Sequence, residues 1–162
     1  MRAVSVKASA EILRGVPLFA DCDEAHLHVL AFAGKRVEFA IGEHVVVEGK
    51  RADSAYLILD GEADIVSRNQ YGEAEVETAV PGTFIGETAM VAGIPFSVSV
   101  IASTPVTAAR IRRSVLMRVA REYPEFGVAV YGSLSRRLAE TLADLQKVRG
   151  LLDGAGSFSD LR

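Results

Sequence analysis

The segment from residue 35 to residue 112 consists of short β-branched and aromatic runs separated by turns. KRVEFAIGEHVVVEG, SAYLILDGEADIVSR and AEVETAVPG show the period of two that is typical of strands. The turns carry glycine: Gly42, Gly49, Gly61 and Gly82. SVSVIAST and VTAARIRR follow, and we expect Pro105 to separate them. Short strands at such regular spacing predict one small β-barrel or sandwich.

Asp60 and Gly61 lie between two apolar runs in YLILDGEADIV. An Asp-Gly pair in that setting is a strong short-range hairpin signal, because both residues tolerate a positive φ. We therefore expect a hairpin at this position.

Helical patterns flank the β segment. In LFADCDEAHLHVLAFAGK, Asp21 or Asp23 can cap a short helix that Gly34 ends, so residues 1–34 form a helical lead-in. Residues 113–152 are helical again, and Pro124 divides them into a short helix to about Glu122 and a long one from about Glu125. The glycine- and serine-rich residues 153–162 predict a flexible tail.

The long helix carries a heptad-like seam. Its members are Tyr131, Leu134, Leu138, Thr141, Leu145, Val148 and Leu152. Such a stripe can pack on the protein's own barrel. Because it lasts about three heptads after a barrel that is already closed, we expect a homodimer through residues 125–152.

Charge and cysteine content limit the classes of protein to which this chain can belong. A single cysteine, Cys22, excludes an internal disulfide framework, and its acidic neighbours favour an unreactive thiol. The net charge of −3 gives no general attraction to nucleic acid, although residues 69–109 contain no Lys or Arg at all. Without a signal peptide or an apolar run long enough for a membrane, we expect a cytoplasmic location and no membrane partner.

Enzyme chemistry finds little support. His44 and Glu48 could face one side of a strand, but no third metal ligand accompanies them. His26 and His28 are two apart on a predicted helix and so point to different faces. We expect neither catalysis nor a metal. A helix-turn-helix does not fit after residue 150, so we expect no direct contact with nucleic acid.

The order of the motifs resembles the cyclic-nucleotide-binding domain family, which includes the catabolite activator protein and the regulatory subunits of cyclic-AMP-dependent kinases. The lead-in helix, the strands IGEHVVVEG and AYLILDGEADI, and PGTFIGETAM followed by IPFSVSVIA carry the resemblance. The last two motifs correspond to the family's phosphate-binding cassette, here residues 82–100. The resemblance implies a mainly β fold: a double-stranded β-helix, or jelly-roll-like barrel, with flanking N-terminal helices and a long, dimerising C-terminal helix.

The resemblance also implies a ligand site. Its residues would be Phe84, Ile85, Gly86, Glu87, Thr88, Ala89, Phe96, Ser97, Val98 and, on the long helix, Thr141. Backbone amides at a helix start suit a phosphate, and a carboxylate such as that of Glu87 accepts from a ribose hydroxyl. Glu87 could equally cap its own helix, and Thr141 could be a small residue of the seam.

Phe96 stands where the family places its phosphate-binding arginine, in the pattern P-R-x-A-x-V. A phenyl ring cannot replace a guanidinium, and loss of such a partner costs about 2–5 kcal/mol, or a weakening on the order of 30- to 4,000-fold. Arg68 and Arg110 are the nearest cations in sequence, and both lie outside the cassette. Arg68 could fold inward and contact a ligand, but a solvated surface position is favoured. Phe96 could fill the pocket, support an apolar ligand or belong to the core, and self-filling is favoured.

The sequence therefore predicts a non-catalytic regulatory or sensor domain with weak affinity for cyclic AMP or cyclic GMP. It needs no cofactor, and another small ligand could take the pocket. The alternative is a degenerate pocket in a dimer that serves as an interaction module for an unidentified regulatory protein. Arg136 and Arg137 are expected on a solvated face of the dimer helix.

Overall fold

A computed structural model describes residues 5–156 of the chain. The helices and strands follow the order α1 (Val6–Arg14), a 3₁₀ turn η1 (Pro17–Phe19), α2 (Glu24–Ala33), β1 (Lys35–Phe39), β2 (His44–Val46), β3 (Ser54–Asp60), β4 (Ala63–Arg68), β5 (Ala74–Ala79), β6 (Phe84–Ile85), α3 (Glu87–Ala92), β7 (Ser99–Ala102), β8 (Val106–Arg112), α4 (Arg113–Glu122) and α5 (Pro124–Gly156).

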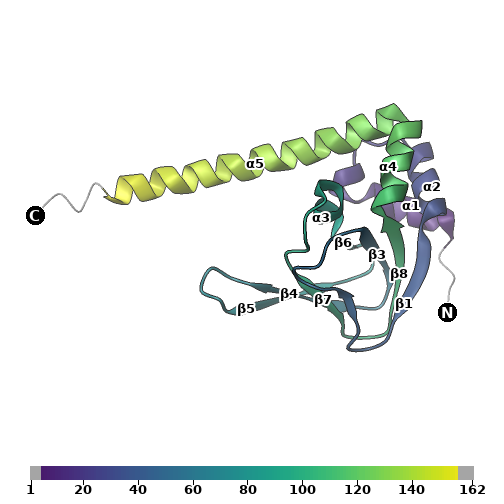
Figure 1. The fold of residues 1–162 in the computed structure, drawn as a ribbon, viewed down its shortest axis with the longest axis horizontal. Helices are drawn as coiled ribbons and strands as arrows, with labels where there is room; N and C mark the ends of the chain where they lie inside the picture. The colour runs from purple at the N-terminus through teal and green to yellow at the C-terminus, as the bar shows by residue number, and fades with distance from the viewer. Residues whose placement is uncertain (1–4, 157–162) are drawn as a thin grey trace, which may run out of the picture.

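The strands form two antiparallel sheets of four, in the orders β1-β8-β3-β6 and β2-β7-β4-β5. Helices α1, α2 and α4 gather at one end of the sheets, and the β4–β5 hairpin projects from the other side (Figure 1). This arrangement confirms the predicted jelly-roll-like fold with flanking helices. Within residues 5–156 the two sheets are not joined into one continuously hydrogen-bonded barrel.

The hairpin predicted at Asp60-Gly61 is wrong. β3 pairs with β6 and β8, whereas β4 pairs with β5 and β7, so the turn carries the chain from one sheet to the other. Gly61 does need its positive φ of +85°, and a Cβ there would lie 2.1 Å from the carbonyl oxygen of Pro105. The Glu62 amide donates to Thr104 Oγ1, at 2.9 Å. The turn therefore packs on the loop before β8 and does not close a local hairpin.

The N-terminal helices begin and end where capping chemistry places them. Ser5 accepts a hydrogen bond from the Ala8 amide at the start of α1. Asp23, and not Asp21, caps α2 by accepting from the Ala25 amide at 2.8 Å. Gly34 ends that helix, as predicted, and β1 begins at the next residue.

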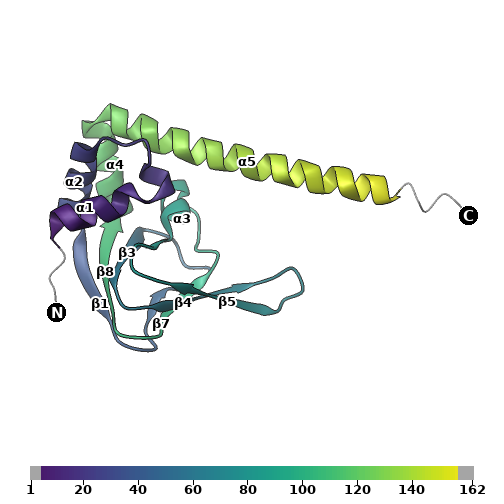
Figure 2. The same ribbon diagram turned by 180° about the vertical axis from the view of Figure 1, so that it is seen from behind.

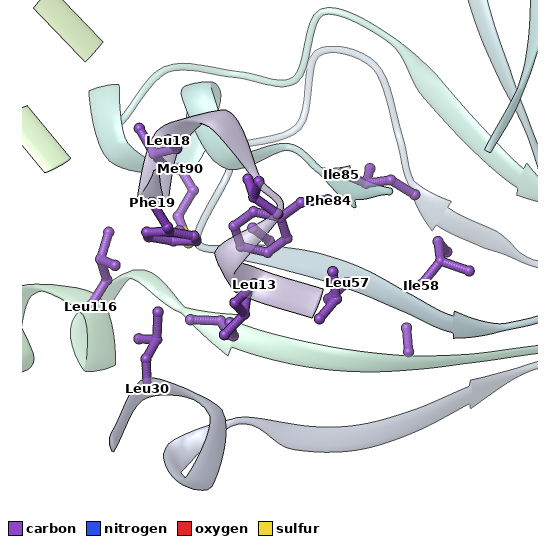
Figure 3. Close-up of a cluster of buried hydrophobic side chains, with 14 of the residues drawn as sticks. Leu13, Leu18, Phe19, Leu30, Leu57, Ile58, Phe84, Ile85, Met90 and Leu116 are labelled. Atoms are coloured by element: carbon purple, nitrogen blue, oxygen red, sulfur yellow. The ribbon is translucent and has the colours of Figure 1, made fainter. Parts of the chain in front are cut away.

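One apolar core joins these helices to the sheets. Figure 3 shows side chains of α1, η1, α2, α3, α4, β3 and β6 converging on a single cluster. At its centre the Phe19 ring lies 5.6 Å from the Phe84 ring and 6.2 Å from the Phe126 ring, measured between centroids. These aromatic contacts connect η1 to β6 and to the first turn of α5.

The C-terminal helical segment is divided into α4 and α5 just before Pro124, as the sequence predicts. Proline suits the first turn of a helix, where its missing N–H has no partner to lose, so α5 begins there. Both views show α5 projecting well beyond the rest of the molecule (Figures 1 and 2). The helix includes residues 153–156 of the segment predicted as a tail, and residues 157–162 lie outside the described part of the chain.

Candidate functional site

The cassette segment turns sharply from strand to helix at one glycine. β6 ends at Ile85, Gly86 adopts a left-handed φ of +78°, and α3 starts at Glu87. No side-chain hydrogen bond caps this helix start, and Glu87 is the acidic residue of its first turn, next to the positive end of the helix dipole. At the other end Gly93, with φ of +69°, closes α3 by donating its amide to the carbonyls of Ala89 and Met90.

A hollow of about 200 Å³ lies in front of this turn. Its lining contains eight of the ten predicted site residues: Ile85, Gly86, Glu87, Thr88, Ala89, Phe96, Ser97 and Val98. A ninth lining residue, Val46 of β2, was not predicted. It lies in an apolar strand run that does not distinguish a pocket residue from a core residue. The segments 85–89 and 96–98 therefore face one another across a single small space.

Two predicted site residues lie elsewhere. Phe84 is buried beneath the cassette, where its ring meets that of Phe19. Thr141 lies on the exposed part of α5, and its hydroxyl donates to the carbonyl of Arg137 at 2.9 Å. Neither residue lines the hollow.

Phe96 is buried, with 9% of its surface exposed, and its ring packs directly on Gly86. A Cβ built on Gly86 would lie 2.5 Å from Cε1 of that ring. Two backbone bonds of 2.9 Å hold Phe96 in place: its amide donates to the Lys50 carbonyl, and its carbonyl accepts from the Gly49 amide. The aromatic ring therefore covers the glycine at the entrance to the cassette helix.

A cation reaches the edge of the cassette from far along the chain. Nη1 of Arg137, on α5, lies 3.4 Å from Oε1 of Glu87. Arg136 beside it pairs with Asp21, in the turn before α2. Both arginines are exposed on α5, as expected, and each also pairs with a carboxylate of the domain body.

The two cations nearest in sequence stay away from the hollow, as expected. Nη1 of Arg68 donates to the Gly72 carbonyl at 3.0 Å, within the β4–β5 hairpin. Nε of Arg110 donates to the Ser54 hydroxyl at 3.1 Å. No lysine or arginine is among the residues that line the hollow. Sequence neighbourhood could not identify Arg137, because fifty residues separate it from Glu87.

The metal-site candidates of the sequence do not form a metal-binding cluster within the described residues. No group of three or more His, Cys, Asp or Glu side chains within residues 5–156 could hold a metal ion. Glu48 lies beyond the end of β2, so it shares no strand with His44. Burial, followed by the charge of Asp21, raises the pKa of the Cys22 thiol to about 11. Among the described helices, none has both the length and the apolar character of a membrane span.

The chain is similar to one curated regulatory protein in particular. The chain is 28% identical over 134 residues to a cAMP-dependent protein kinase regulatory subunit of Mycosarcoma maydis, a match that covers 83% of this chain and 25% of that protein. The chain thus spans about a quarter of the length of that relative.

Solved structures share the fold. The N-terminal domain of a transcriptional regulator from Streptomyces coelicolor A3(2) matches with a TM-score of 0.71 at 25% identity, over 80% of this chain and 94% of that one. The catabolite activator protein of Thermus thermophilus matches with a TM-score of 0.67 at 19% identity, over 83% of this chain and 63% of that one. At that identity the second likeness concerns the fold alone.

The cassette and the strands that carry it lie within a recognised sequence family. The family model described as the cyclic nucleotide-binding domain matches residues 36–123, from β1 to the end of α4 and more than half of the chain. By this match, and by the Gly86 turn and hollow that it includes, the chain belongs to the cyclic nucleotide-binding domain family.

Proposed function

We propose that the protein is a non-catalytic regulatory domain that acts as a homodimer and binds cyclic AMP and cyclic GMP weakly or not at all. Its place in the family makes it a cyclic-nucleotide-binding-like regulatory domain. The same proposal places it in the cytoplasm, without a metal or a required cofactor and without direct contact with nucleic acid.

The observation that carries the proposal is the contact between Phe96 and Gly86. A cyclic nucleotide brings a phosphate anion, which needs a counter-charge or several strong donors in a site that excludes water. The Phe96 ring covers the glycine whose turn opens α3, and no cationic side chain lines the hollow. A ligand that enters must therefore be small, or must displace the ring.

Glu87 gives the domain a way to pass a signal to α5. Its carboxylate is the only charged group in the lining of the hollow, and it pairs with Arg137 at the hollow's edge. A ligand hydroxyl that binds Glu87 competes with Arg137 for the same oxygen atoms. Occupancy would then change how firmly α3 is attached to α5, which is a change that a partner can sense.

Apolar exposure along α5 supports the homodimer. Leu138, Leu145, Val148 and Leu152 of the seam are each more than half exposed. Successive members are seven, three and four residues apart, which fits the heptad spacing of a coiled-coil interface. A second copy would bury this stripe, which has no cover within the described chain.

A second candidate function is an interaction module whose pocket has degenerated. The hollow of about 200 Å³ is smaller than the roughly 300–1,000 Å³ of typical small-molecule sites. In that case the dimer itself, through α5 and the domain body, would present the surface that a regulatory protein binds.

Calorimetric titration with cyclic AMP and cyclic GMP separates these functions. The parent protein, Phe96→Arg and a control, Phe32→Arg, are compared. Phe32 is 79% exposed on α2 and does not line the cassette hollow, so the control substitution adds the same charge outside that hollow. We expect no saturable binding by the parent or the control. Saturable binding by Phe96→Arg alone favours the degenerate pocket, because it shows that only the cation is missing.

Tight binding of either nucleotide by the parent protein would contradict the proposal. It would mean that Arg137 or another group supplies the phosphate contact. Repeating the titration with Arg137→Gln would then identify the cation, because loss of binding in that variant assigns it directly.

A further inference from the structure

A second hollow, away from the cassette turn, is lined by four arginines. It lies where β8 runs into α4 beside the start of β3, a junction visible in Figure 1. Its volume is about 440 Å³. The lining residues are Arg51, Ala52, Asp53, Ser54, Arg110, Arg112, Arg113 and Ser114.

Positive charge in this hollow is largely uncompensated. Asp53 is the only acid in the lining, against four guanidinium groups. Among the residues that the structure describes, no carboxylate lies within ion-pair distance of Arg51, Arg110, Arg112 or Arg113. The chain as a whole has a net charge of −3, so this excess is a local feature and not a consequence of composition.

The start of α4 adds to the positive potential. The first turn of this helix contains no acidic residue, and no side chain caps it at Arg112. The N-terminal end of a helix dipole is positive, so Arg112 and Arg113 stand where basic residues are disfavoured. A bound anion would relieve both the helix end and the clustered guanidinium groups.

Two of the arginines are already held in position. Nε of Arg113 donates to the Met90 carbonyl at 2.9 Å, and Nε of Arg110 donates to the Ser54 hydroxyl at 3.1 Å. Each bond uses one of the five N–H donors of its guanidinium group. Ordering these side chains before a ligand arrives lowers the entropic cost of binding it.

We propose that this arginine hollow binds a chain of two or three phosphates, in a site distinct from the cassette hollow, with which it shares no lining residue. Guanidinium groups pair bidentately with phosphate oxygens, and several of them match the multiple negative charges of such a chain. The volume of about 440 Å³ lies in the usual range for small-molecule sites. Asp53 repels a phosphate but accepts a hydrogen bond from a hydroxyl, so it favours a ligand with a sugar or polyol beyond the phosphates.

Titration calorimetry with sodium tripolyphosphate at low salt and neutral pH tests the site. We expect one saturable site per chain in the parent protein. The double variant Arg51→Ala, Arg112→Ala removes the two exposed arginines and should weaken binding by roughly tenfold or more. The control Arg118→Ala, Arg121→Ala removes the same charge from exposed positions of α4 outside the hollow and should bind like the parent.

Three results would overturn the proposal. One is an equal loss of binding in both double variants, which indicates general electrostatic attraction. The second is tighter binding of duplex DNA than of tripolyphosphate. The third is binding to phosphatidylcholine vesicles that contain phosphatidylinositol bisphosphate without binding of the soluble phosphate chain, which indicates a membrane surface. Adenosine triphosphate that binds at least as well as tripolyphosphate supports the site and its expected preference for a sugar beyond the phosphates.

The cassette variant Phe96→Arg tests whether tripolyphosphate binds the arginine hollow or the cassette hollow. Phe96→Arg alters the lining of the cassette hollow and substitutes no lining residue of the arginine hollow, although the adjacent Pro95 forms a β-bridge with Arg51. Tripolyphosphate binding by this variant should therefore equal that of the parent, whatever the variant does to cyclic nucleotides. Tighter tripolyphosphate binding by Phe96→Arg than by the parent would show that the phosphate chain binds the cassette, where the variant adds a cation, and would overturn the proposal.

Discussion

Arg137 on α5 and Glu87 on α3 lie 3.4 Å apart across an interval of fifty residues, and they join the C-terminal helix to the cassette. Their side chains are 43% and 18% exposed, so the pair is screened but not fully solvated. In a double-mutant cycle with Arg137→Gln and Glu87→Gln, urea unfolding should give a coupling free energy of about 0.5–1 kcal/mol. Added salt should reduce it.

A second pair on α5 is the control for this cycle. Arg149 and Asp153 lie 4.0 Å apart, with side chains 85% and 77% exposed. We expect no measurable coupling between them, because solvent screens both charges. Equal coupling in the two cycles would contradict a special connection between α3 and α5.

Gly86→Ala should lower the free energy of unfolding for two reasons, one in the backbone and one in side-chain packing. The left-handed backbone penalises a side chain by roughly 1–2 kcal/mol, and the new methyl group also pushes on the Phe96 ring. Gly42→Ala is the matched control, because Gly42 has a φ of +85° and no heavy atom within 4 Å of an added Cβ. We therefore expect a larger loss in unfolding free energy for Gly86→Ala.

Removing the Phe96 ring separates the steric cost of the new methyl group from the backbone cost of Gly86→Ala. In the Phe96→Ala background, Gly86→Ala should cost less than in the parent, with a coupling of about 1 kcal/mol in urea unfolding. The prediction fails if the two glycine substitutions are equally destabilising in the parent protein.

Local chemistry in the sequence predicts the elements of this fold better than their partners. Asp60-Gly61 does form a turn, and Gly61 does adopt a positive φ. The two strands nevertheless do not pair with each other: β3 pairs with the distant β6 and β8, whereas β4 pairs with β5 in the next hairpin and with the distant β7. A dipeptide specifies the turn, while the burial of both strands decides which sheet each one joins.

The candidate site likewise contains residues that local motifs predict and one, Arg137, that they do not. Contiguous motifs identify the residues around Gly86 and Phe96, which lie close in the sequence. Whether Arg137 lies beside Glu87 depends on which turn of α5 faces the cassette. The anchoring of Phe126 against Phe19 sets that turn, and it is a tertiary contact that no local pattern contains.

The seam of α5 should decide the oligomeric state. Leu138→Glu with Leu145→Glu places two charges in the apolar stripe, where a dimer would have to bury them. By sedimentation at micromolar concentration we expect a dimer for the parent and a monomer for this variant. Ala143→Glu with Gln146→Glu adds two charges at exposed positions outside the seam and should remain dimeric. A parent protein that sediments as a monomer would contradict the proposed homodimer.

The thiol of Cys22 should make stability depend on alkaline pH. Burial, and then the charge of Asp21, raises its pKa from an ordinary value of 9.0 to about 11 in the folded protein. Between these values the unfolded chain loses a proton that the folded chain keeps, so the free energy of unfolding falls as the pH rises through this window. Below the lower value both states are protonated and the contribution is complete.

Urea unfolding of the parent protein and of Cys22→Ala, from about pH 8 to about pH 11, measures this effect. Tyr56, whose pKa burial also raises, contributes a similar slope to both proteins. The difference between the two curves therefore reports Cys22 alone, and we expect the parent to lose stability faster than the variant. Parallel curves would mean that the thiol titrates alike in the folded and unfolded chains, contrary to its partial burial beside Asp21.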